Sequence, residues 1–413
     1  MPPVVLVPRS PWKGRRIVLG VTGGVAAYKT VQLARDLTRL GGVVDVVPTE
    51  SALRFVTPLS YEAVTGRPPL TDMFSAEGAA LHVRLGREAD VVCVAPATAD
   101  FVARAAHGRS NDLICTTLLA TRAPVVVCPA MNDVMYDHIQ VRANLEHLSS
   151  ALGYEVVGPA VGPLAAGEGE GPGRMTEPVE IVEHIGRALG RDTRWQDRHV
   201  LVTAGPTREP IDPVRYVGNR SSGRMGYALA AAAWRRGARV TLVSGPSALD
   251  APVGVDLVRV ESAVEMHAAV AERIGDADVS IFAAAVADYR PADVRSDKLK
   301  RRDQGDALAL ELTENPDVAR DTMSQRKAGS VAVGFALETS EVLTNARKKL
   351  EAKSFDLLVA NDAGEEGAGF EVDTNRVTIL SAEDDPERLP LASKHEVAEQ
   401  ILDRVTSALE RGS

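Results

Sequence analysis

The sequence predicts an α/β protein built from two Rossmann-like parallel-sheet domains, and two observations support this fold class. Short apolar runs, typical of buried parallel strands, alternate with helical segments, and a strand–helix–strand unit opens each half of the chain, at residues 16–47 and 199–243. The 413 residues are too many for one typical domain and fit two of about 200 residues each. We therefore expect one domain over residues 1–190 and another over residues 191–413.

The composition is that of a globular protein and argues against two classes of partner. Hydrophobic residues make up 45% of the chain and charged residues 25%, and no apolar run approaches the length of about 18 residues that a membrane span needs. The net charge of −9 argues against general nucleic-acid binding. Residues 1–14 lack the apolar core of a signal peptide, so we expect a cytoplasmic protein. Cys93, Cys115 and Cys128 lie in or beside apolar runs, which favours buried free thiols over disulfides or a metal cluster.

The first strand and its turn suggest one ligand position. Residues 16–21 are predicted as a buried strand, Thr22-Gly23-Gly24 turns into a helix over residues 25–40, and residues 43–47 form the second strand. Two glycines before a helix N-terminus suit a phosphate group, but such a pair is about as often a simple tight turn. This turn alone does not decide between the two interpretations.

Two later strands of the first half end in polar segments. The strand at residues 89–95 is followed by Thr98, and the strand at residues 125–128 is followed by Pro129–Met135. In open parallel sheets, ligands bind outside the carboxyl ends of the strands. We therefore expect Thr98 and residues 129–135 on the same edge, although Pro and Asn are also common in simple strand-end turns.

The segment 203–226 is the most unusual part of the second half. It lies between a strand and an alanine-rich helix over residues 225–236, and its prolines favour an extended backbone. Its glycines allow close approach of a ligand, and its four arginines bring permanent cations to a helix N-terminus, which favours anions. We interpret it as a phosphate- or nucleotide-binding loop rather than an ordinary surface loop. The absence of G-x-G-x-x-G argues against a nicotinamide cofactor. The arginines are Arg208, Arg215, Arg220 and Arg224.

Helix boundaries are predicted from capping residues. Thr176 is expected as the N-cap of a helix that runs to about Leu189, and Ser393-Lys-His-Glu396 as a capping box that opens the C-terminal helix. Residues 190–199 are polar and poorly periodic, so we expect a linker there.

These segments together resemble the bifunctional phosphopantothenoylcysteine decarboxylase/phosphopantothenate–cysteine ligase family of coenzyme A biosynthesis, over nearly the whole chain. The resemblance implies an FMN-dependent decarboxylase domain at residues 1–190 and a CTP-dependent ligase domain at residues 191–413. It implies FMN and Mg²⁺ as cofactors, CTP as cosubstrate, and 4′-phosphopantothenate and cysteine as substrates. It also implies a homo-oligomer, in which decarboxylase halves form trimers that assemble into dodecamers and ligase halves pair as dimers.

The resemblance assigns roles to residues of the first half. Pro129-Ala-Met-Asn-x-x-Met135 matches the substrate-binding motif of FMN-dependent cysteine decarboxylases, and Asn132 looks like the residue that holds the substrate carboxylate. His82 corresponds to the active-site histidine, a base near the substrate thiol, although a lone histidine is usually structural or merely exposed. The implied FMN contacts are Gly23, Gly24, Val25, Ser51, Thr98 and Ala130, and the further substrate contacts are Asn111, Met135 and Arg174.

One departure from the family lies in a glycine-rich flap at residues 165–175. The flap has one extra residue, and Ala166 stands where the family has the cysteine of the reductive step. The glycines still suit a segment that closes over a substrate. Glu168, Glu170 or a water molecule are the alternative proton sources, and the sequence does not choose between them.

The resemblance assigns the ligase residues in the same way. Asn219 matches the residue that holds the acyl-cytidylate, and Lys298 matches the essential lysine of a cationic flap that continues through Lys300, Arg301 and Arg302. Most charge runs are only solvated faces. Asp288 is placed to meet the nucleotide or its metal ion. The other implied substrate contacts are Arg215, Phe282, Ala283, Ala284, Pro316, Asp317, Val318, Ala319, Phe335, Lys349 and Lys353.

Two other functions stay open at this point. A flavin- and nucleotide-binding regulator that has lost decarboxylase chemistry fits the missing flap cysteine, but His82 and Lys298 argue against it. An NADPH-dependent flavin oxidoreductase is the second alternative, and the absence of G-x-G-x-x-G argues against it. Consumption of CTP only when both 4′-phosphopantothenate and cysteine are present, or release of CO₂, separates these alternatives.

Overall fold

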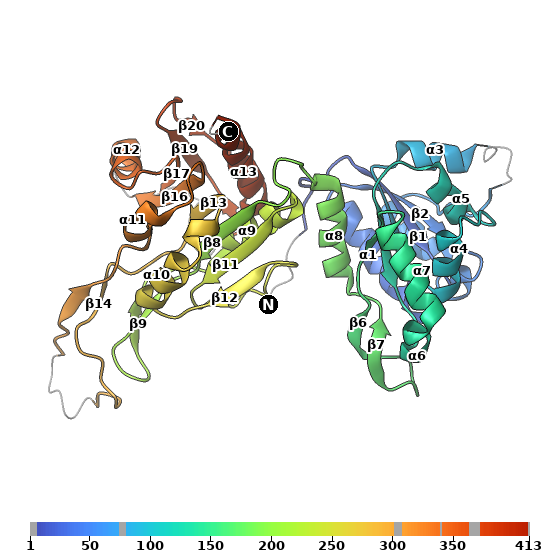
Figure 1. Cartoon of the computed structure of the whole chain (residues 1–413), viewed down its shortest axis with the longest axis horizontal. Helices are drawn as coiled ribbons and strands as arrows, with labels where there is room; N and C mark the ends of the chain where they lie inside the picture. Colours follow the sequence, from blue (N-terminus) through green and yellow to red (C-terminus); the bar gives the residue numbers. More distant parts are fainter. Residues whose placement is uncertain (1–5, 74–79, 301–307, 339–340, 363–371, 412–413) are drawn as a thin grey trace. The chain divides into compact units, whose positions relative to one another are not determined.

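The computed structural model describes residues 6–73, 80–300, 308–338, 341–362 and 372–411. The chain divides into two compact units, Met1–Arg191 and Asp192–Ser413, coloured blue to green and green to red in Figure 1. Each unit has helices packed on a mainly parallel sheet, so the predicted fold class is confirmed. Among the described residues, no helix combines the length and the apolar character that crossing a bilayer would require.

The first unit contains a five-stranded sheet of order β2-β1-β3-β4-β5, and all of its pairings are parallel. The apolar runs of the sequence form the central strands because both faces of the sheet are covered by helices, which buries nearly all residues of β1, β3 and β4. The strands are β1 (Arg16–Val21), β2 (Val43–Pro48), β3 (Val91–Ala97), β4 (Val125–Pro129) and β5 (Glu155–Val156).

Apolar helix faces build a core on each side of this sheet. Trp12 and the buried faces of α1 and α8 pack on one side, and α3, α4, α5 and α7 pack on the other. The helices are α1 (Lys29–Arg39), α2 (Pro58–Thr65), α3 (Leu81–Glu88), α4 (Ala99–Ala106), α5 (Leu113–Ala120), α6 (Asp133–Asp137), α7 (Ile139–Ser150) and α8 (Pro178–Gly190). The 3₁₀ turn Val25–Tyr28 precedes α1, and β6 (Ala160–Pro163) pairs antiparallel with β7 (Glu170–Arg174).

The second unit contains an eight-stranded sheet of order β12-β11-β8-β13-β16-β17-β19-β20. Pairing is parallel from β12 to β17, whereas β19 and β20 add antiparallel strands at one edge. The strands are β8 (His199–Ala204), β11 (Arg239–Ser244), β12 (Asp256–Arg259), β13 (Val279–Phe282), β16 (Val331–Glu338), β17 (Leu357–Asp362), β19 (Val377–Ser381) and β20 (Glu387–Arg388). The helices are α9 (Arg224–Arg235), α10 (Ala263–Ala271), α11 (Val318–Thr322), α12 (Val342–Ala352) and α13 (Lys394–Arg411).

Short antiparallel pairs extend from this sheet. The segment expected to be one loop, residues 203–226, contains β9 (Arg208–Pro210) and β10 (Tyr216–Gly218), which pair with each other. β14 (Tyr289–Pro291) pairs with β15 (Leu312–Glu314), and β18 (Thr374–Asn375) with β21 (Ala392–Ser393).

Two details of the helix and linker predictions differ from the structure. The N-cap of α8 is Glu177 rather than Thr176, since Thr176 is buried and its hydroxyl donates to the carbonyl of Val157 at 3.4 Å. Within the expected linker, Trp195 is fully buried in the second unit and its Nε1 donates to Thr406 at 2.9 Å. The Ser393 half of the predicted capping box is confirmed, because the Glu396 N–H donates to Oγ of Ser393 at 3.2 Å.

Candidate active sites

The first unit has a cavity of about 1110 Å³ at the carboxyl edge of its sheet. The loops that follow β1, β2, β3 and β4 line it, together with the β6–β7 flap. This is the edge at which open parallel sheets bind their ligands. The predicted residues that line it are Gly23, Gly24, Val25, Ser51, Thr98, Asn111, Ala130, Asn132, Met135 and Arg174.

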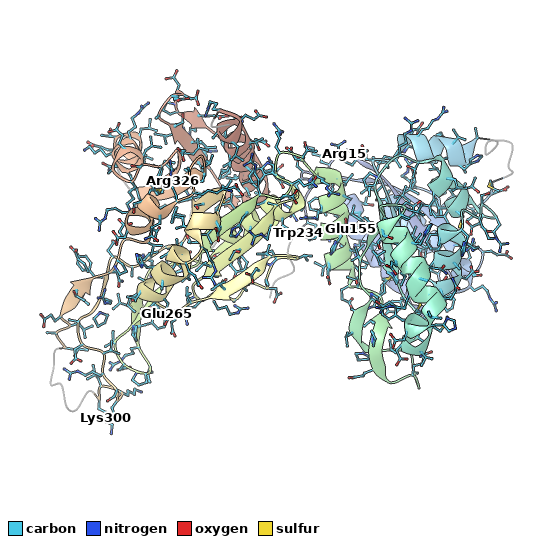
Figure 2. The ribbon with its side chains drawn as sticks, viewed as in Figure 1. Arg15, Glu155, Trp234, Glu265, Lys300 and Arg326 are labelled. Carbon is cyan, nitrogen blue, oxygen red and sulfur yellow. The ribbon has the colours of Figure 1, made fainter. Side chains whose placement is uncertain are left out.

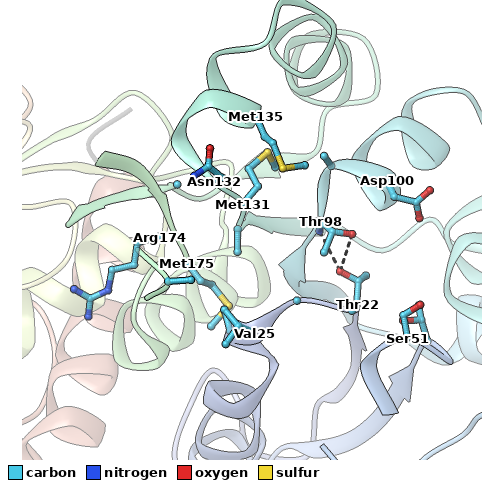
Figure 3. A pocket seen from close by; sticks show the side chains of 18 of the residues that line it. Thr22, Val25, Ser51, Thr98, Asp100, Met131, Asn132, Met135, Arg174 and Met175 are labelled. Carbon is cyan, nitrogen blue, oxygen red and sulfur yellow. Dashed lines mark hydrogen bonds between the residues drawn. The ribbon is translucent and has the colours of Figure 1, made fainter. Parts of the chain in front are cut away.

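Hydroxyl groups and a close backbone approach shape one side of this cavity. The Thr22 hydroxyl donates to the carbonyl of Pro96 at 2.7 Å and accepts the N–H of Thr98 at 3.0 Å, which ties the turn after β1 to the end of β3 (Figure 3). A β-carbon on Gly23 would stand 2.4 Å from Cβ of Ser51. Glycine is therefore required there for the loops after β1 and β2 to approach each other.

Asn132 joins the loop after β4 to the flap. Its Oδ1 accepts the N–H of Val134 at 2.9 Å and so caps α6, while its Nδ2 donates to Oε2 of Glu168 at 3.2 Å. The Met131 N–H donates to the carbonyl of Gly173 at 3.0 Å, so the flap strand β7 lies directly against this loop. Of the two flap glutamates named above, Glu168 lines the cavity and Glu170 does not.

Ion pairs fix the charged groups on the cavity wall. Nζ of Lys29 lies 2.8 Å from Oε1 of Glu177, which also pairs with Arg174. The hydrogen bond from Lys29 is the main reason why the pKa of Glu177 is lowered. On another part of the wall, Nε of Arg104 donates to Asp100 at 2.9 Å. Lys29 and Arg104 were not predicted from the sequence, because neither belongs to a motif.

The second unit has a smaller cavity of about 330 Å³, at the carboxyl ends of β13 and β16. Nζ of Lys353 lies 2.7 Å from Oδ2 of Asp317, and Nζ of Lys349 donates to the carbonyl of Phe335 at 3.1 Å. Burial is the largest single influence on Asp317 and raises its pKa, but the hydrogen bonds and charges of Lys353 and Arg320 together lower the pKa of this carboxyl. The predicted residues that line this cavity are Phe282, Ala284, Asp288, Pro316, Asp317, Val318, Ala319, Phe335, Lys349 and Lys353.

Comparison with known proteins agrees with this division. Residues 8–190 match the family described as Flavoprotein, and residues 195–409 match the DNA/pantothenate metabolism flavoprotein C-terminal domain. The coenzyme A biosynthesis bifunctional protein CoaBC of Vibrio vulnificus is 45% identical over 398 residues, which are 96% of this chain and 98% of the relative. The CoaBC proteins of Escherichia coli and Bacillus subtilis are 45% and 42% identical, each over 95% of this chain and 97% of the relative.

The chain belongs to the CoaBC family. It is therefore a bifunctional enzyme of coenzyme A biosynthesis, with a flavoprotein decarboxylase half and a ligase half. Solved structures with similar sequences include the C-terminal domain of a CoaBC protein, with 40% identity over 53% of this chain and 100% of that chain and a TM-score of 0.46. Another is the FMN-dependent cysteine decarboxylase SpaF, with 33% identity over 43% and 97% of the two chains and a TM-score of 0.37.

Among the residues to which the sequence analysis gives a contact or catalytic role in the flavoprotein half, His82 is the one that lies outside the cavity lining. It lies in the first turn of α3 and does not line the cavity of its own chain. Its Nδ1 is buried and has no hydrogen-bond partner in the described part of the chain. All three cysteines are buried and free, as expected, and burial raises the pKa of Cys115 to about 12.

Four residues predicted in the ligase half lie outside the lining of its cavity: Arg215, Asn219, Ala283 and Lys298. Asn219 lies next to it, because its Nδ2 donates to the carbonyl of Val286 at 2.9 Å and Val286 lines the cavity. Lys298 is exposed on the segment after β14. Arg301 and Arg302 fall outside the described residues.

The arginines of the segment 203–226 do not converge on this cavity. Arg208 stacks on the ring of Tyr216 at 4.6 Å, and Arg215 pairs with Asp212 at 2.5 Å. Asp212 was missed by sequence reasoning, although Asp before Pro-Val-Arg is a common turn signal. In the described ranges no group of three or more His, Cys, Asp or Glu residues is arranged to hold a metal ion.

Proposed function

We propose that the flavoprotein half decarboxylates 4′-phosphopantothenoylcysteine with FMN, and that the ligase half joins 4′-phosphopantothenate to cysteine with CTP and Mg²⁺. The observation that carries this proposal is that each unit has a cavity at the carboxyl edge of its sheet lined by most of the residues expected for that reaction. The ligase product is the decarboxylase substrate. One chain would then catalyse two successive reactions.

The cavity of the first unit suits FMN. The turn at Gly23 and Gly24 lines the cavity just before a helix start, and Ser51 and Thr98 add hydroxyls for the phosphate. Val25, Met131 and Met175 offer apolar surface for a ring system. Bound flavin would take up and return two electrons, which allows CO₂ to leave without net redox change.

Asn132 would hold the substrate carboxylate, because its amide is already fixed at the N-cap of α6. We propose that His82 acts as the base at the substrate thiol in the cavity of a second copy, since it does not line its own. Exposed apolar side chains at the cavity rim favour such an assembly: Val25, Tyr28 and Met135 are 59%, 61% and 48% exposed. The expected trimers of this half, their dodecamer, and dimers of the ligase half belong to this proposal.

In the ligase half, the carboxylate of 4′-phosphopantothenate would attack the α-phosphorus of CTP and expel pyrophosphate, which gives an acyl-cytidylate. The amino group of cysteine would then attack the acyl carbon, lose a proton and expel CMP. Lys349, Lys353 and Lys298 supply positive charge for the triphosphate. Asp288, an exposed carboxylate on the cavity wall, would contact the nucleotide or Mg²⁺. An enzyme that consumes CTP and cysteine is expected in the cytoplasm, where these compounds are made.

The test gives purified protein 4′-phosphopantothenate and CTP, with and without cysteine, and measures pyrophosphate and CMP. A second assay supplies 4′-phosphopantothenoylcysteine and measures CO₂. We expect CMP release from CTP to require both 4′-phosphopantothenate and cysteine. CO₂ release should require only 4′-phosphopantothenoylcysteine. A regulator without chemistry would give neither product, and CO₂ release that depends on added NADPH would favour a flavin oxidoreductase.

A further inference from the structure

Asp212 is a buried carboxylate that the reactions above do not use. It is 3% exposed, and its side chain is fully covered. Its Oδ1 accepts the N–H groups of Val214 and Arg215, each at 2.9 Å, which closes the turn between β9 and β10. Its Oδ2 accepts Nε of Arg215 at 3.0 Å and Nη2 at 2.5 Å.

The same carboxylate reaches a second segment that is distant in sequence. Oδ2 of Asp212 accepts the N–H of Leu299 at 3.1 Å, and Nη2 of Arg215 donates to the carbonyl of Leu299 at 2.9 Å. Both backbone groups of Leu299 are therefore bound by the Asp212–Arg215 pair. A third tie joins the N–H of Arg295 to the carbonyl of Ile211 at 3.0 Å.

These ties matter because the segment they bind has no helix or strand of its own. Residues 292–300 follow β14, and Lys298 and Lys300 on either side of Leu299 are exposed. Figure 2 shows Lys300 on this segment. Holding both backbone groups of Leu299 restricts the dihedral angles of its neighbours, so Lys298 starts from a fixed backbone position. The hydrogen bond from Arg215 is the main reason why the pKa of Asp212 lies well below its ordinary value, so this carboxylate stays ionised.

We propose that Asp212 is a positioning residue for the ligase reaction: it joins the Arg215 turn and the Lys298 segment into one unit and thereby sets the place of Lys298. This inference rests on the proposed role of Lys298. Asp212 contacts neither cavity in the described structure, so it acts through the residues it binds. If Asp212 only stabilised the fold, the effect of its replacement on the ligase rate would be the same whether residue 298 is Lys or Gln.

The test compares Asp212→Asn in the full-length protein with a control, Asp293→Asn, which removes an exposed ion pair to Arg295 on the same segment. Amide hydrogen exchange of the peptide that contains Leu299 is the first measurement. We expect at least about tenfold faster exchange in D212N and little change in D293N, because only D212N frees the Leu299 amide. The turnover number for CTP-dependent pyrophosphate release should fall at least about tenfold in D212N, with KM for CTP nearly unchanged.

The double variant D212N/K298Q separates positioning from a general structural role. If Asp212 acts through Lys298, the double variant is no slower than K298Q alone, whereas independent effects would multiply. Multiplying effects, or unchanged exchange at Leu299, overturn the inference. Faster exchange with normal pyrophosphate release also overturns it. Wild-type protein without ligase activity would instead refute the proposed function. The exchange result would still report on the Asp212–Leu299 hydrogen bond. If D212N does not fold, Arg215→Met is used instead: it removes the bond to the Leu299 carbonyl and leaves the Asp212 bond, so exchange of the same peptide should rise, but less than is expected for D212N.

Discussion

Each unit places its ligand loops at the carboxyl edge of its own parallel sheet, but the two units build these loops differently. In the first unit, β1 passes into the helical segment through the three residues Thr22–Gly24, and the cavity forms between loops that follow four neighbouring strands. In the second unit, residues 205–223 separate β8 from α9 and contain their own antiparallel pair. The first site is shaped by the sheet edge, whereas the second also depends on segments that extend beyond it.

This difference changes how far a predicted site residue can be from its cavity. In the flavoprotein half, His82 is the one residue among the assigned FMN, substrate and catalytic contacts that does not line the cavity. In the ligase half, Lys298, Arg215 and Asn219 belong to the extended segments. Hydrogen bonds rather than the sheet hold Arg215, Asn219 and Leu299, the neighbour of Lys298. The predictions for Lys298, Asn219 and Gly23 test whether the two sites depend on these different supports.

The largest expected effect is that of Lys298→Gln on the ligase reaction. Expelling pyrophosphate concentrates negative charge, and a charged donor that acts mainly in the transition state contributes about 3–4 kcal/mol, which is roughly a 10²–10³-fold rate effect. Glutamine keeps much of the length but removes the charge. We expect the rate of acyl-cytidylate formation to fall by this factor. CO₂ release by the flavoprotein half should stay normal, because the units have separate cores.

Lys300→Gln is the matched control, since Lys300 is exposed on the same segment two residues away. Pyrophosphate release should be nearly normal in K300Q. Equal losses in both variants would show that the segment provides only general positive charge, and loss of decarboxylation in K298Q would indicate a folding or assembly defect.

Asn219→Asp is expected to block the second ligase half-reaction more than the first. The Asn219 amide donates to the carbonyls of Val286 and Ala285, at 2.9 and 3.4 Å, and a carboxylate would face these oxygens and the phosphate without a donor. We expect labelled acyl-cytidylate to accumulate, with its conversion slowed about 10–100-fold, a loss of about 1–3 kcal/mol. Absence of the intermediate together with loss of pyrophosphate release would contradict this role.

In the flavoprotein half, Gly23→Ala and Gly24→Ala form a matched pair. The new β-carbon of Gly23→Ala would stand 2.4 Å from Cβ of Ser51, whereas that of Gly24→Ala would stand 3.4 Å from Cγ2 of Thr98, an ordinary contact. Overpacking of this kind costs about 1–3 kcal/mol. We expect flavin affinity, measured from the flavin absorbance of purified protein, to fall about tenfold or more in G23A only. If both variants retained similar amounts of flavin, the close approach of Gly23 to Ser51 would not be needed for flavin binding.

Features set by local sequence were predictable, and features set by long-range contacts were not. Apolar runs and turn residues predicted β1, β3 and β4 and the edge where their loops meet, because these patterns act within one strand and its turn. The capping box at Ser393 was predictable for the same reason.

Contacts between distant segments left no pattern in the sequence. The Asp212–Leu299 hydrogen bond joins residues that are 87 positions apart, and the Lys29–Glu177 pair joins residues that are 148 positions apart. Trp195 looked like part of a polar linker because its burial comes from α13, far along the chain. Such contacts depend on tertiary packing, which local propensity does not encode.

The smallest expected effect concerns the pH dependence of stability in the second unit. Lys394, at the start of α13, is 6% exposed, and burial, followed by the nearby charge of Arg224, lowers its pKa to about 8. The ordinary value for lysine is about 10.4. Between these two values the unfolded chain binds more protons than the folded one, so stability increases as the pH rises through this range.

We expect wild-type stability to gain about 1 kcal/mol between pH 8 and 9 relative to Lys394→Met, because methionine carries no proton to release. Denaturant unfolding of the second unit at the two pH values measures this difference. Lys348→Met, at an exposed position of α12, is the control and should show the same pH dependence as the wild type. Parallel pH profiles for wild type and K394M would mean that neither burial nor the charge of Arg224 lowers the pKa of Lys394 in the folded protein.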